Sequence, residues 1–459
     1  MNVKSFYLVS LGCAKNTVDS QSMAQLLVGS GYRSVQDVDD AGLIVVNTCG
    51  FIGPAKEESL RVLAELADSK RAGQKLIAAG CLTQRYGADV VRQVPGIDGV
   101  LGTRRWMDIV DVAQRLRGGG HPEPVYHLPE VPTVGSDERG VLRAAVQGAS
   151  VYLKIADGCS RPCAFCAIPL IKGPAVSRSL EVILEDAITL QERGARELIL
   201  IAQDTSDYGH DLGLKDGLAQ LLERLVESVP EVDWIRVMYT YPGHVTNRLI
   251  EVMASSPQIV PYLDMPLQHA HPDALRRMRR PANLEWVYTT IEDIRAEIPD
   301  LALRTTFIVG YPGETDGEFQ TLLDFTAEMC FDRVGAFQFS FEPGTISEAL
   351  GDPIPPQVKE ERYNRLMELQ QPISLEKNQS LVGKKMDVLV EGQGDGISIG
   401  RTYRDAPEID GVVVIEGRVP AGEMVPVRIN GAMVYDLSGF VESDSALVHA
   451  NKEKMEGHA

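Results

Sequence analysis

Residues 159–166 read Cys-Ser-Arg-Pro-Cys-Ala-Phe-Cys, shortly after an apolar run at residues 152–155 that predicts a strand. Three thiolates with this C-x3-C-x2-C spacing can hold three irons of a four-iron, four-sulfur (4Fe-4S) cluster. The fourth iron then has no protein ligand, whereas electron-transfer clusters usually have four cysteines. An open iron lets a cluster bind and reduce a small molecule. The triplet therefore predicts radical chemistry on S-adenosylmethionine (SAM), with the hard step carried by the cofactor.

The first 118 residues alternate short apolar runs with helical patterns. The apolar runs cover residues 6–11, 43–46 and 76–79, and the helical patterns cover residues 18–27, 55–67 and 84–94. Short apolar runs that alternate with amphipathic helices indicate a parallel sheet. This part of the chain is therefore predicted to be an open parallel α/β domain.

A cysteine follows each of these three apolar runs: Cys13, Cys49 and Cys81. Because the carboxyl ends of neighbouring parallel strands meet in one crevice, we expect the three thiols to lie together and to bind metal. The alternative is three unrelated core cysteines, but three at the same structural position are hard to attribute to chance. Cys330 stands alone after a helical pattern, and it is expected to be a small buried hydrophobe.

Glycine and proline mark a linker at residues 119–144, part of which can still form strands that run between domains. The linker divides the chain into an N-terminal domain at 1–118 and a central domain at 145–377. A C-terminal domain follows at 378–445. The tail at 446–459 is expected to be disordered.

The central segment has six apolar runs separated by helical patterns. They cover residues 152–155, 198–201, 234–238, 262–265, 303–309 and 336–339. Six β/α units predict a partial (β/α)6 barrel rather than a closed barrel of eight. Barrel chemistry lies at the carboxyl ends of the strands, and the cysteine triplet follows the first strand, as this rule requires.

Other residues at strand ends are candidates for binding the cofactor. Gln203 follows the second strand, and residues 310–314, Gly-Tyr-Pro-Gly-Glu, follow the fifth. Turns of this composition are common, so a purely structural turn is the alternative. The position at a barrel strand end favours Gly310 and Glu314 as cofactor contacts.

The C-terminal segment changes to short strands separated by glycines. They are expected at residues 388–390, 397–399, 412–415, 424–429 and 434–437, which predicts a five-stranded barrel. Such modules often bind single-stranded nucleic acid through basic and aromatic residues. Between Gln379 and Phe440, however, six basic residues stand against nine acidic ones, a formal charge of −3. The segment lacks the footprint of an RNA-binding module, and a basic protein surface is the more plausible partner.

The whole chain of 459 residues has a formal charge of −19 and is 44% hydrophobic, as expected for a globular protein. An acidic chain repels phosphate unless its basic residues cluster, which argues against a nucleic-acid substrate. The sequence has no apolar run long enough to cross a bilayer and no secretory pattern at its start. A cytoplasmic location is predicted, where cysteines stay reduced and available to metal.

With two cysteine triads and a small C-terminal barrel, the chain resembles, from end to end, the methylthiotransferases of the radical-SAM superfamily. This resemblance implies that Cys159, Cys163 and Cys166 hold the cluster that binds SAM. It implies an auxiliary cluster on the three N-terminal cysteines and a C-terminal TRAM barrel. Phe165 matches the aromatic residue often found just before the last cysteine of the triplet.

Two stretches resemble one branch of that family. Residues 10–16 read Ser-Leu-Gly-Cys-Ala-Lys-Asn, and residues 400–411 read Gly-Arg-Thr-Tyr-Arg-Asp-Ala-Pro-Glu-Ile-Asp-Gly. That branch modifies the β-carbon of an aspartate in protein S-twelve of the small ribosomal subunit. The acidic charge of the TRAM segment does not depend on the resemblance, and it agrees with a protein substrate.

The resemblance implies two 4Fe-4S clusters and two molecules of SAM per turnover. One cluster would cleave SAM to start the radical reaction, and the other would supply sulfur, with the methyl group coming from a second SAM. An unactivated C–H bond has no acidic proton for a base to remove, so no acid–base residue is predicted. The implied partners are protein S-twelve, free or on the ribosome, and an electron-donating reductant.

Two alternative functions belong to other classes. A methylthiotransferase acting on adenosine in transfer RNA would bind RNA with an affinity that falls steeply with salt. An iron–sulfur electron carrier or cluster scaffold would need neither the six-unit barrel nor the turn at residues 310–314, and it would bind no SAM.

Overall fold

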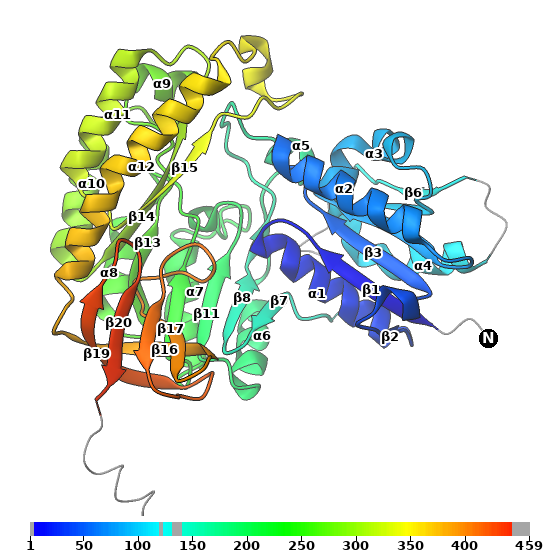
Figure 1. Cartoon of the computed structure of the whole chain (residues 1–459), viewed down its shortest axis with the longest axis horizontal. Helices are drawn as coiled ribbons and strands as arrows, with labels where there is room; N and C mark the ends of the chain where they lie inside the picture. The colour runs from blue at the N-terminus through cyan, green and yellow to red at the C-terminus, as the bar shows by residue number, and fades with distance from the viewer. Residues whose placement is uncertain (1–3, 119–122, 131–139, 443–459) are drawn as a thin grey trace, which may run out of the picture.

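The computed structural model describes residues 4–118, 123–130 and 140–442, which form three units in chain order. Figure 1 shows the N-terminal unit in blue beside the central one, and the C-terminal barrel in orange and red below one end of the central unit. The predicted fold class is confirmed for all three units. No helix among the described residues has the length and apolar character needed to cross a membrane. The predicted tail at 446–459 lies outside the described residues.

The N-terminal unit is an open sheet of six parallel strands in the order β2-β1-β3-β4-β5-β6. Three of them are the predicted strands that precede the cysteines, and three short ones were not predicted. The most distal, β6, comes from the glycine- and proline-rich linker and adds to the sheet edge beside β5. The strands are β1 (Ser5–Ser10), β2 (Arg33–Ser34), β3 (Leu43–Thr48), β4 (Lys75–Gly80), β5 (Gly99–Gly102) and β6 (Val125–His127).

Helices cover both faces of this sheet, which explains why β3 is buried along its whole length. Val45 points to the face covered by α1 and α4, while Ile44 and Val46 point to the face covered by α2 and α3. Strands that are buried on both faces have continuous apolar runs, and this is the pattern that made them predictable. The helices are α1 (Ala14–Gly29), α2 (Gly53–Ser69), α3 (Cys81–Gln93) and α4 (Ile109–Arg117).

The central unit has seven strands in the order β15-β14-β13-β12-β11-β8-β7 and forms an open sheet. Six are parallel and match the predicted runs, so the partial barrel is confirmed. The seventh, β7, pairs antiparallel with β8 at one edge. The strands are β7 (Ala144–Gln147), β8 (Ser150–Lys154), β11 (Glu197–Ile201), β12 (Trp234–Val237), β13 (Ile259–Asp264), β14 (Ala302–Val309) and β15 (Arg333–Gln338).

Five helices between the strands cover the outer face of this sheet. Their buried residues join the strands in one large apolar core. A sixth, unpredicted helix, α12 (Pro356–Gln379), packs along β15 and leads into the C-terminal unit. The five helices are α6 (Leu180–Glu192), α7 (Gly217–Ser228), α8 (Asn247–Ser255), α10 (Leu284–Glu297) and α11 (Asp316–Met329).

The C-terminal unit is a closed barrel of five strands in the order β16-β17-β18-β20-β19. It closes through the parallel pairing of β18 with β20. The last strand begins at Leu437, so the strand expected at residues 434–437 was placed too early; residues 434–436 form a bend before it. The strands are β16 (Lys385–Gln393), β17 (Ile397–Arg401), β18 (Val413–Glu416), β19 (Met424–Ala432) and β20 (Leu437–Val441).

The barrel packs against the inner face of the central sheet. Leu389 and Ala406 of the barrel join Tyr152, Ile199 and Tyr262 of the sheet in one apolar cluster. This contact closes one end of the sheet and leaves the opposite end, where the parallel strands have their carboxyl ends, open to the N-terminal unit.

Candidate functional site

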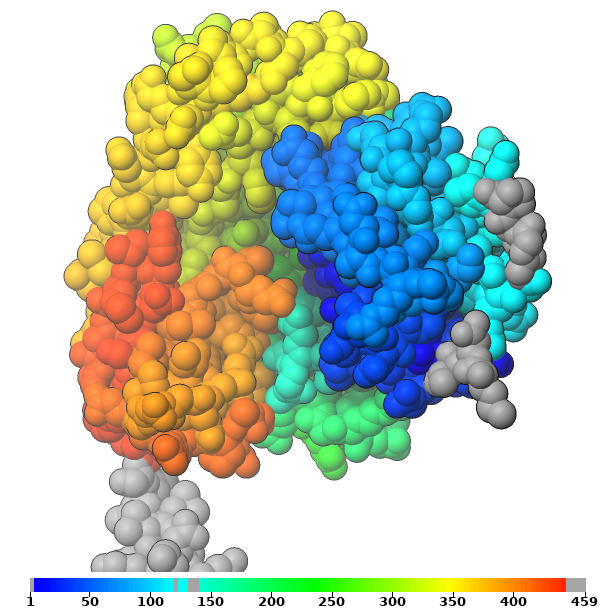
Figure 2. Space-filling view, turned by 45° about the vertical axis from the view of Figure 1, so that its right-hand side comes forward, coloured from blue at the N-terminus to red at the C-terminus, as the bar shows by residue number. Residues whose placement is uncertain are grey.

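One cavity of about 450 Å³ lies where the N-terminal sheet meets the carboxyl ends of the central strands. Both cysteine triads line it, although they come from different units of the chain. Figure 2 shows the surface hollowed between the blue N-terminal unit and the orange C-terminal barrel. The cysteines that line the cavity are Cys13, Cys49, Cys81, Cys159, Cys163 and Cys166.

Strand register brings the N-terminal triad together. Thr48 at the end of β3 lies opposite Gly80 at the end of β4, so Cys49 and Cys81 follow at the same level of the sheet. Cys13 precedes α1 after the neighbouring strand. At Gly12, φ is +90°, and a β-carbon there would lie 2.7 Å from the β-carbon of Cys49. Only glycine allows this close approach of the Cys13 loop to Cys49.

The triad of the central unit, Cys159, Cys163 and Cys166, lies in a loop whose two ends are joined by a pair of short strands. β9 (Ala156–Asp157) pairs antiparallel with β10 (Val176–Ser177), which brackets the cysteine loop. Within the loop, the Cys159 backbone N–H donates to the Gly173 carbonyl at 3.0 Å. Arg280 Nη1 donates to Cys163 Sγ at 3.6 Å. These contacts position the loop that carries the three thiols.

Burial raises the pKa of several of these thiols. The pKa rises to about 12 for Cys81, to about 11 for Cys159 and to about 12 for Cys166. Buried thiols of this kind stay protonated at neutral pH unless a metal binds and displaces the proton. These three thiols are therefore poor nucleophiles as they stand.

The spacing of the sulfur atoms disfavours a single ion. Among the described residues, one group of three side chains that could hold a metal has its ligand atoms within 4.8 Å of one another: His271, Asp273 and Glu318. Neither cysteine triad meets this limit. Ligand sulfurs around one zinc lie closer together than that, because each Zn–S bond is about 2.3 Å. A larger group such as an iron–sulfur cluster fits either triad better.

The four predicted cofactor contacts divide into two pairs. Phe165 and Gln203 line the cavity, and Phe165 packs against Met278, Tyr311 and Phe339. Gly310 and Glu314 are not among its lining residues. Glu314 instead closes the turn after β14: its Oε2 accepts from the Tyr311 N–H at 3.0 Å, and its Oε1 lies 3.5 Å from Arg362 Nη1.

The Glu314 turn gives a pH-dependent prediction. Burial raises the pKa of Glu314 to about 7, despite the arginine, from an ordinary value of 4.5. A raised pKa means that the native state binds the Glu314 proton more tightly than the unfolded chain does. Protonated Glu314 therefore contributes its full share of the free energy of unfolding below pH 4.5, and this share is lost as pH rises through 7. Between pH 4.5 and pH 7, the free energy of unfolding of the unaltered protein should fall by roughly 3 kcal/mol relative to that of Glu314→Gln. Thermal unfolding of both proteins against pH measures this difference.

The matched control is Asp316→Asn, which removes an exposed carboxylate that is bound to the same Arg362 at 2.7 Å. It should keep the pH profile of the unaltered protein. Parallel profiles for Glu314→Gln and the unaltered protein would contradict the prediction.

Several further residues in the cavity were not predicted from the sequence. Asp264 ends β13 and Tyr239 follows β12, so the strand-end rule could have identified both. The others depend on how the units pack together: Ile409 reaches the cavity from the C-terminal barrel, and Lys15 from α1. The unpredicted lining residues that carry charge, a ring or apolar surface include Lys15, Arg161, Tyr239, Asp264, Arg280, Arg304, Phe337 and Ile409.

The stretch at residues 400–411 joins the C-terminal barrel to the cavity. Arg401 is buried and bonds to Glu197 of the central sheet at 2.6 Å. Asp410 accepts from the Tyr262 hydroxyl at 2.7 Å and lies 3.4 Å from Arg304. Most charges of this stretch thus bind the central unit, while Ile409 remains exposed at the cavity wall.

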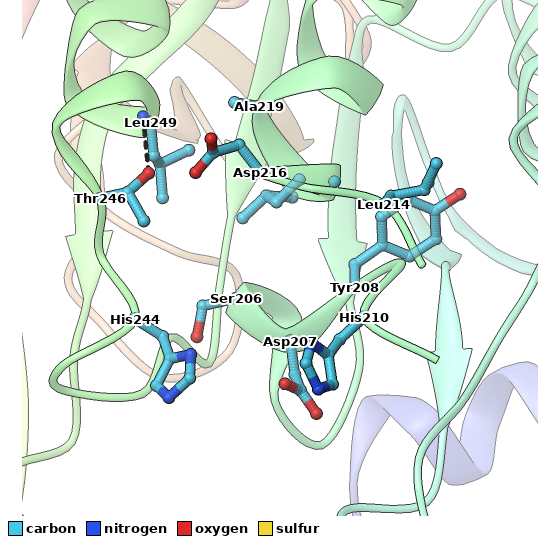
Figure 3. Close-up of a pocket in the computed structure, with 12 residues that line it drawn as sticks. Ser206, Asp207, Tyr208, His210, Leu214, Asp216, Ala219, His244, Thr246 and Leu249 are labelled. Carbon is cyan, nitrogen blue, oxygen red and sulfur yellow. Dashed lines mark hydrogen bonds between the residues drawn. The ribbon is translucent and has the colours of Figure 1, made fainter. Parts of the chain in front are cut away.

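A second, smaller cavity of about 120 Å³ adjoins the first. Figure 3 shows Asp207, His210 and His244 among its walls. Arg161 links the two cavities, since it donates to Asp207 at 2.8 Å and contacts His244 Nε2 at 2.9 Å. Arginine can only donate, so this Nε2 accepts, and burial together with Arg161 lowers the pKa of His244.

Cys330 differs from the other cysteines and from its expectation. It is exposed rather than buried, in the left-handed conformation that ends α11, with φ of +46°. Its Sγ donates to the Ala327 carbonyl at 3.1 Å, and it does not line the cavity. A helix end at the surface, rather than an apolar core, explains the difference.

Comparison with known families assigns each unit. The description "Uncharacterized protein family UPF0004" matches residues 5–102, "Radical SAM superfamily" matches residues 153–326, and "TRAM domain" matches residues 382–441. A solved structure of the radical S-adenosylmethionine methyltransferase TsrM from Kitasatospora setae has a TM-score of 0.55 at 13% identity, covering 86% of this chain and 80% of that chain. At this identity the likeness shows the fold alone.

Curated relatives are much more similar. Ribosomal protein uS12 methylthiotransferase RimO of Roseiflexus sp. (strain RS-1) is 47% identical over 95% of this chain and 96% of its own length. The same enzyme of Chloroflexus aurantiacus is 49% identical over 95% of this chain and 99% of its own length. The fold and the cysteine loop define a radical-SAM enzyme, a class that uses an iron–sulfur cluster and SAM. More particularly, the chain belongs to the family of ribosomal protein uS12 methylthiotransferases.

Proposed function

We propose that the enzyme adds a methylthio group to the β-carbon of an aspartate in ribosomal protein uS12, the small-subunit protein S-twelve, using two 4Fe-4S clusters. The observation that carries the proposal is that two cysteine triads, from separate units of the chain, line one cavity. Three ligands in each triad would leave one iron of each cluster open. When bound, the clusters supply the electron that cleaves SAM and the sulfur that is transferred.

The protein's own contribution is to hold these groups. Cys159, Cys163 and Cys166 would hold the cluster on the barrel side. Phe165 and Gln203 also line the cavity and would contact SAM there. Cys13, Cys49 and Cys81 would hold the auxiliary cluster on the opposite wall. The shared cavity would bring both clusters and the substrate to one place.

A protein substrate is supported by the charges of the TRAM barrel. Among its six basic residues, Arg401 pairs with Glu197, Arg404 pairs with Asp332, and Arg428 pairs with Glu442. Arg401 and Arg404 are largely buried in these pairs and are not free to contact phosphate, whereas the Arg428 pair is partly exposed. RNA-binding modules of this size need an exposed basic face, which the paired arginines do not offer. A cytoplasmic location and an electron-donating reductant complete the proposal.

The test is an anaerobic assay of the cluster-reconstituted enzyme with SAM and a chemical reductant. One tube holds purified uS12, the second holds unmodified transfer RNA, and a third holds uS12 without reductant. Mass spectrometry should detect a methylthio group on the aspartate in the first tube alone. Modification of the RNA and not of uS12 would overturn the proposed substrate, and release of no methylthio product in either tube would overturn the reaction.

A further inference from the structure

One cation in the cavity, Lys15, has neither a hydrogen bond nor an ion pair among the described residues. Five cationic side chains line the cavity: Lys15, Arg161, Lys172, Arg280 and Arg304. Three of them are neutralised by carboxylates at 2.6 to 2.9 Å: Arg161 by Asp204, Lys172 by Asp19 and Arg304 by Asp264. These three are structural ion pairs that a ligand would have to break.

The other two cations have no carboxylate partner within the described parts of the chain. Arg280 donates to Cys163 Sγ and to the Pro266 carbonyl, so it belongs to the barrel wall where SAM is expected. Lys15 is two residues from Cys13, on the opposite wall. The structure gives Lys15 no hydrogen bond and no ion pair; its Nζ lies 3.0 Å from the ring centroid of Tyr239.

The surroundings of Lys15 favour the binding of an anion. A cation on an aromatic face still has N–H donors that point away from the ring. Tyr239 has φ of +63°, a conformation that is rare for a bulky residue, and its backbone N–H donates to Asp264 at 3.2 Å. Strain of this kind gathers at binding and catalytic sites. The neighbouring N-terminus of α1 has no side-chain cap, so the helix dipole adds to the positive charge.

We infer that Lys15 binds the side-chain carboxylate of the substrate aspartate. The inference rests on the proposed function and deepens it. The β-carbon, which would receive the methylthio group, is bonded directly to the carboxyl carbon. An ion pair between Lys15 and the carboxylate would therefore position the reacting carbon one bond away from the bound group. Binding at the N-terminal wall would also place this carbon beside the auxiliary triad. Lys15 would thus select aspartate over uncharged residues of the same size.

The test combines two substitutions. Asparagine has nearly the same size as aspartate but no charge, so the preference for uS12 over its variant with asparagine at the target position reports recognition of the charge. The unaltered enzyme should prefer aspartate in kcat/KM by about 10- to 100-fold, the usual value of a charge-assisted hydrogen bond. Lys15→Gln should reduce this ratio to within about threefold, and Lys15→Arg should restore most of it.

The control is Lys56→Gln, because the Lys56 Nζ lies over the Tyr86 ring at 4.1 Å in the same unit but outside the cavity. It should keep the full preference for aspartate. An unchanged preference in Lys15→Gln would overturn the inference. So would a Lys15→Gln enzyme whose only defect is weaker SAM binding, because the carboxylate would then be that of SAM. Failure of the unaltered enzyme on uS12 would instead overturn the proposed function.

Discussion

Replacing Cys163 with alanine is expected to abolish the cleavage of SAM, whereas replacing Cys49 with alanine is expected to leave cleavage intact and abolish sulfur transfer. The two thiols line the same cavity but belong to different triads on different units. Mutation of residues that only hydrogen-bond to metal ligands lowers metal affinity or activity by about 10- to 100-fold. Loss of a ligand itself should therefore lower the rate of the affected step by more than about 100-fold.

Two readouts separate the steps. Release of 5′-deoxyadenosine measures SAM cleavage, and mass spectrometry of uS12 measures methylthio transfer. Iron content shows whether each variant still holds one cluster of four irons. Cys330→Ala is the matched control, since this thiol is exposed and lies outside the cavity, and it should leave both steps unchanged. The division of roles would be wrong if Cys49→Ala lost SAM cleavage while it kept the iron of the barrel cluster.

The cysteines were predictable because their signal is local. Each N-terminal cysteine follows an apolar run, and the ends of parallel strands meet at one edge of a sheet. The central triplet is a contiguous motif. The unpredicted strands, such as β2 and β6, have only two or three residues and pair at sheet edges. Their pairing depends on a neighbouring strand that is distant in sequence, so no local pattern reveals them.

The cavity itself was not predictable, because it exists only where two units meet. Lys15 and Ile409 become neighbours of the barrel strands through packing between units, and neither has a pattern that indicates this. Glu314 shows the opposite case. The strand-end rule correctly placed its turn after β14, but its carboxylate binds the turn and Arg362 rather than reaching the cavity. A position at a strand end therefore makes a residue a candidate for the cavity wall, but it does not determine the direction of the side chain.

The packing between the units depends on a buried carboxylate, Asp19 of α1. It binds three cations of the central unit: Lys154, Lys172 at 2.9 Å and Arg143 at 3.1 Å. The side chains of all four are at most 3% exposed. Burial by itself raises the pKa of Asp19, but Lys154 and Lys172 together hold it below its ordinary value, so the carboxylate stays charged.

Asp19→Asn is therefore expected to destabilise the protein strongly and to uncouple its two half-reactions. The change keeps the shape of the side chain but leaves three buried cations to share Asp157 alone, and removal of one partner from a buried pair costs about 3–5 kcal/mol. α1 begins next to Cys13, and β8 leads to the Cys159 loop, so the same ion pairs hold the two triads on facing walls. The amount of methylthio product formed per SAM cleaved should fall.

Asp39→Asn is the matched control for this prediction, because Asp39 pairs with Arg71 in the same unit and both side chains are at least half exposed. Exposed pairs of this kind contribute at most about 1 kcal/mol. Thermal unfolding of the reconstituted proteins, together with the ratio of methylthio product to 5′-deoxyadenosine, compares the two variants. If Asp19→Asn matched Asp39→Asn in both measurements, the buried charges would not be what fixes the distance between the triads. The apolar contacts of α1 with the central unit would then have to hold the cavity together.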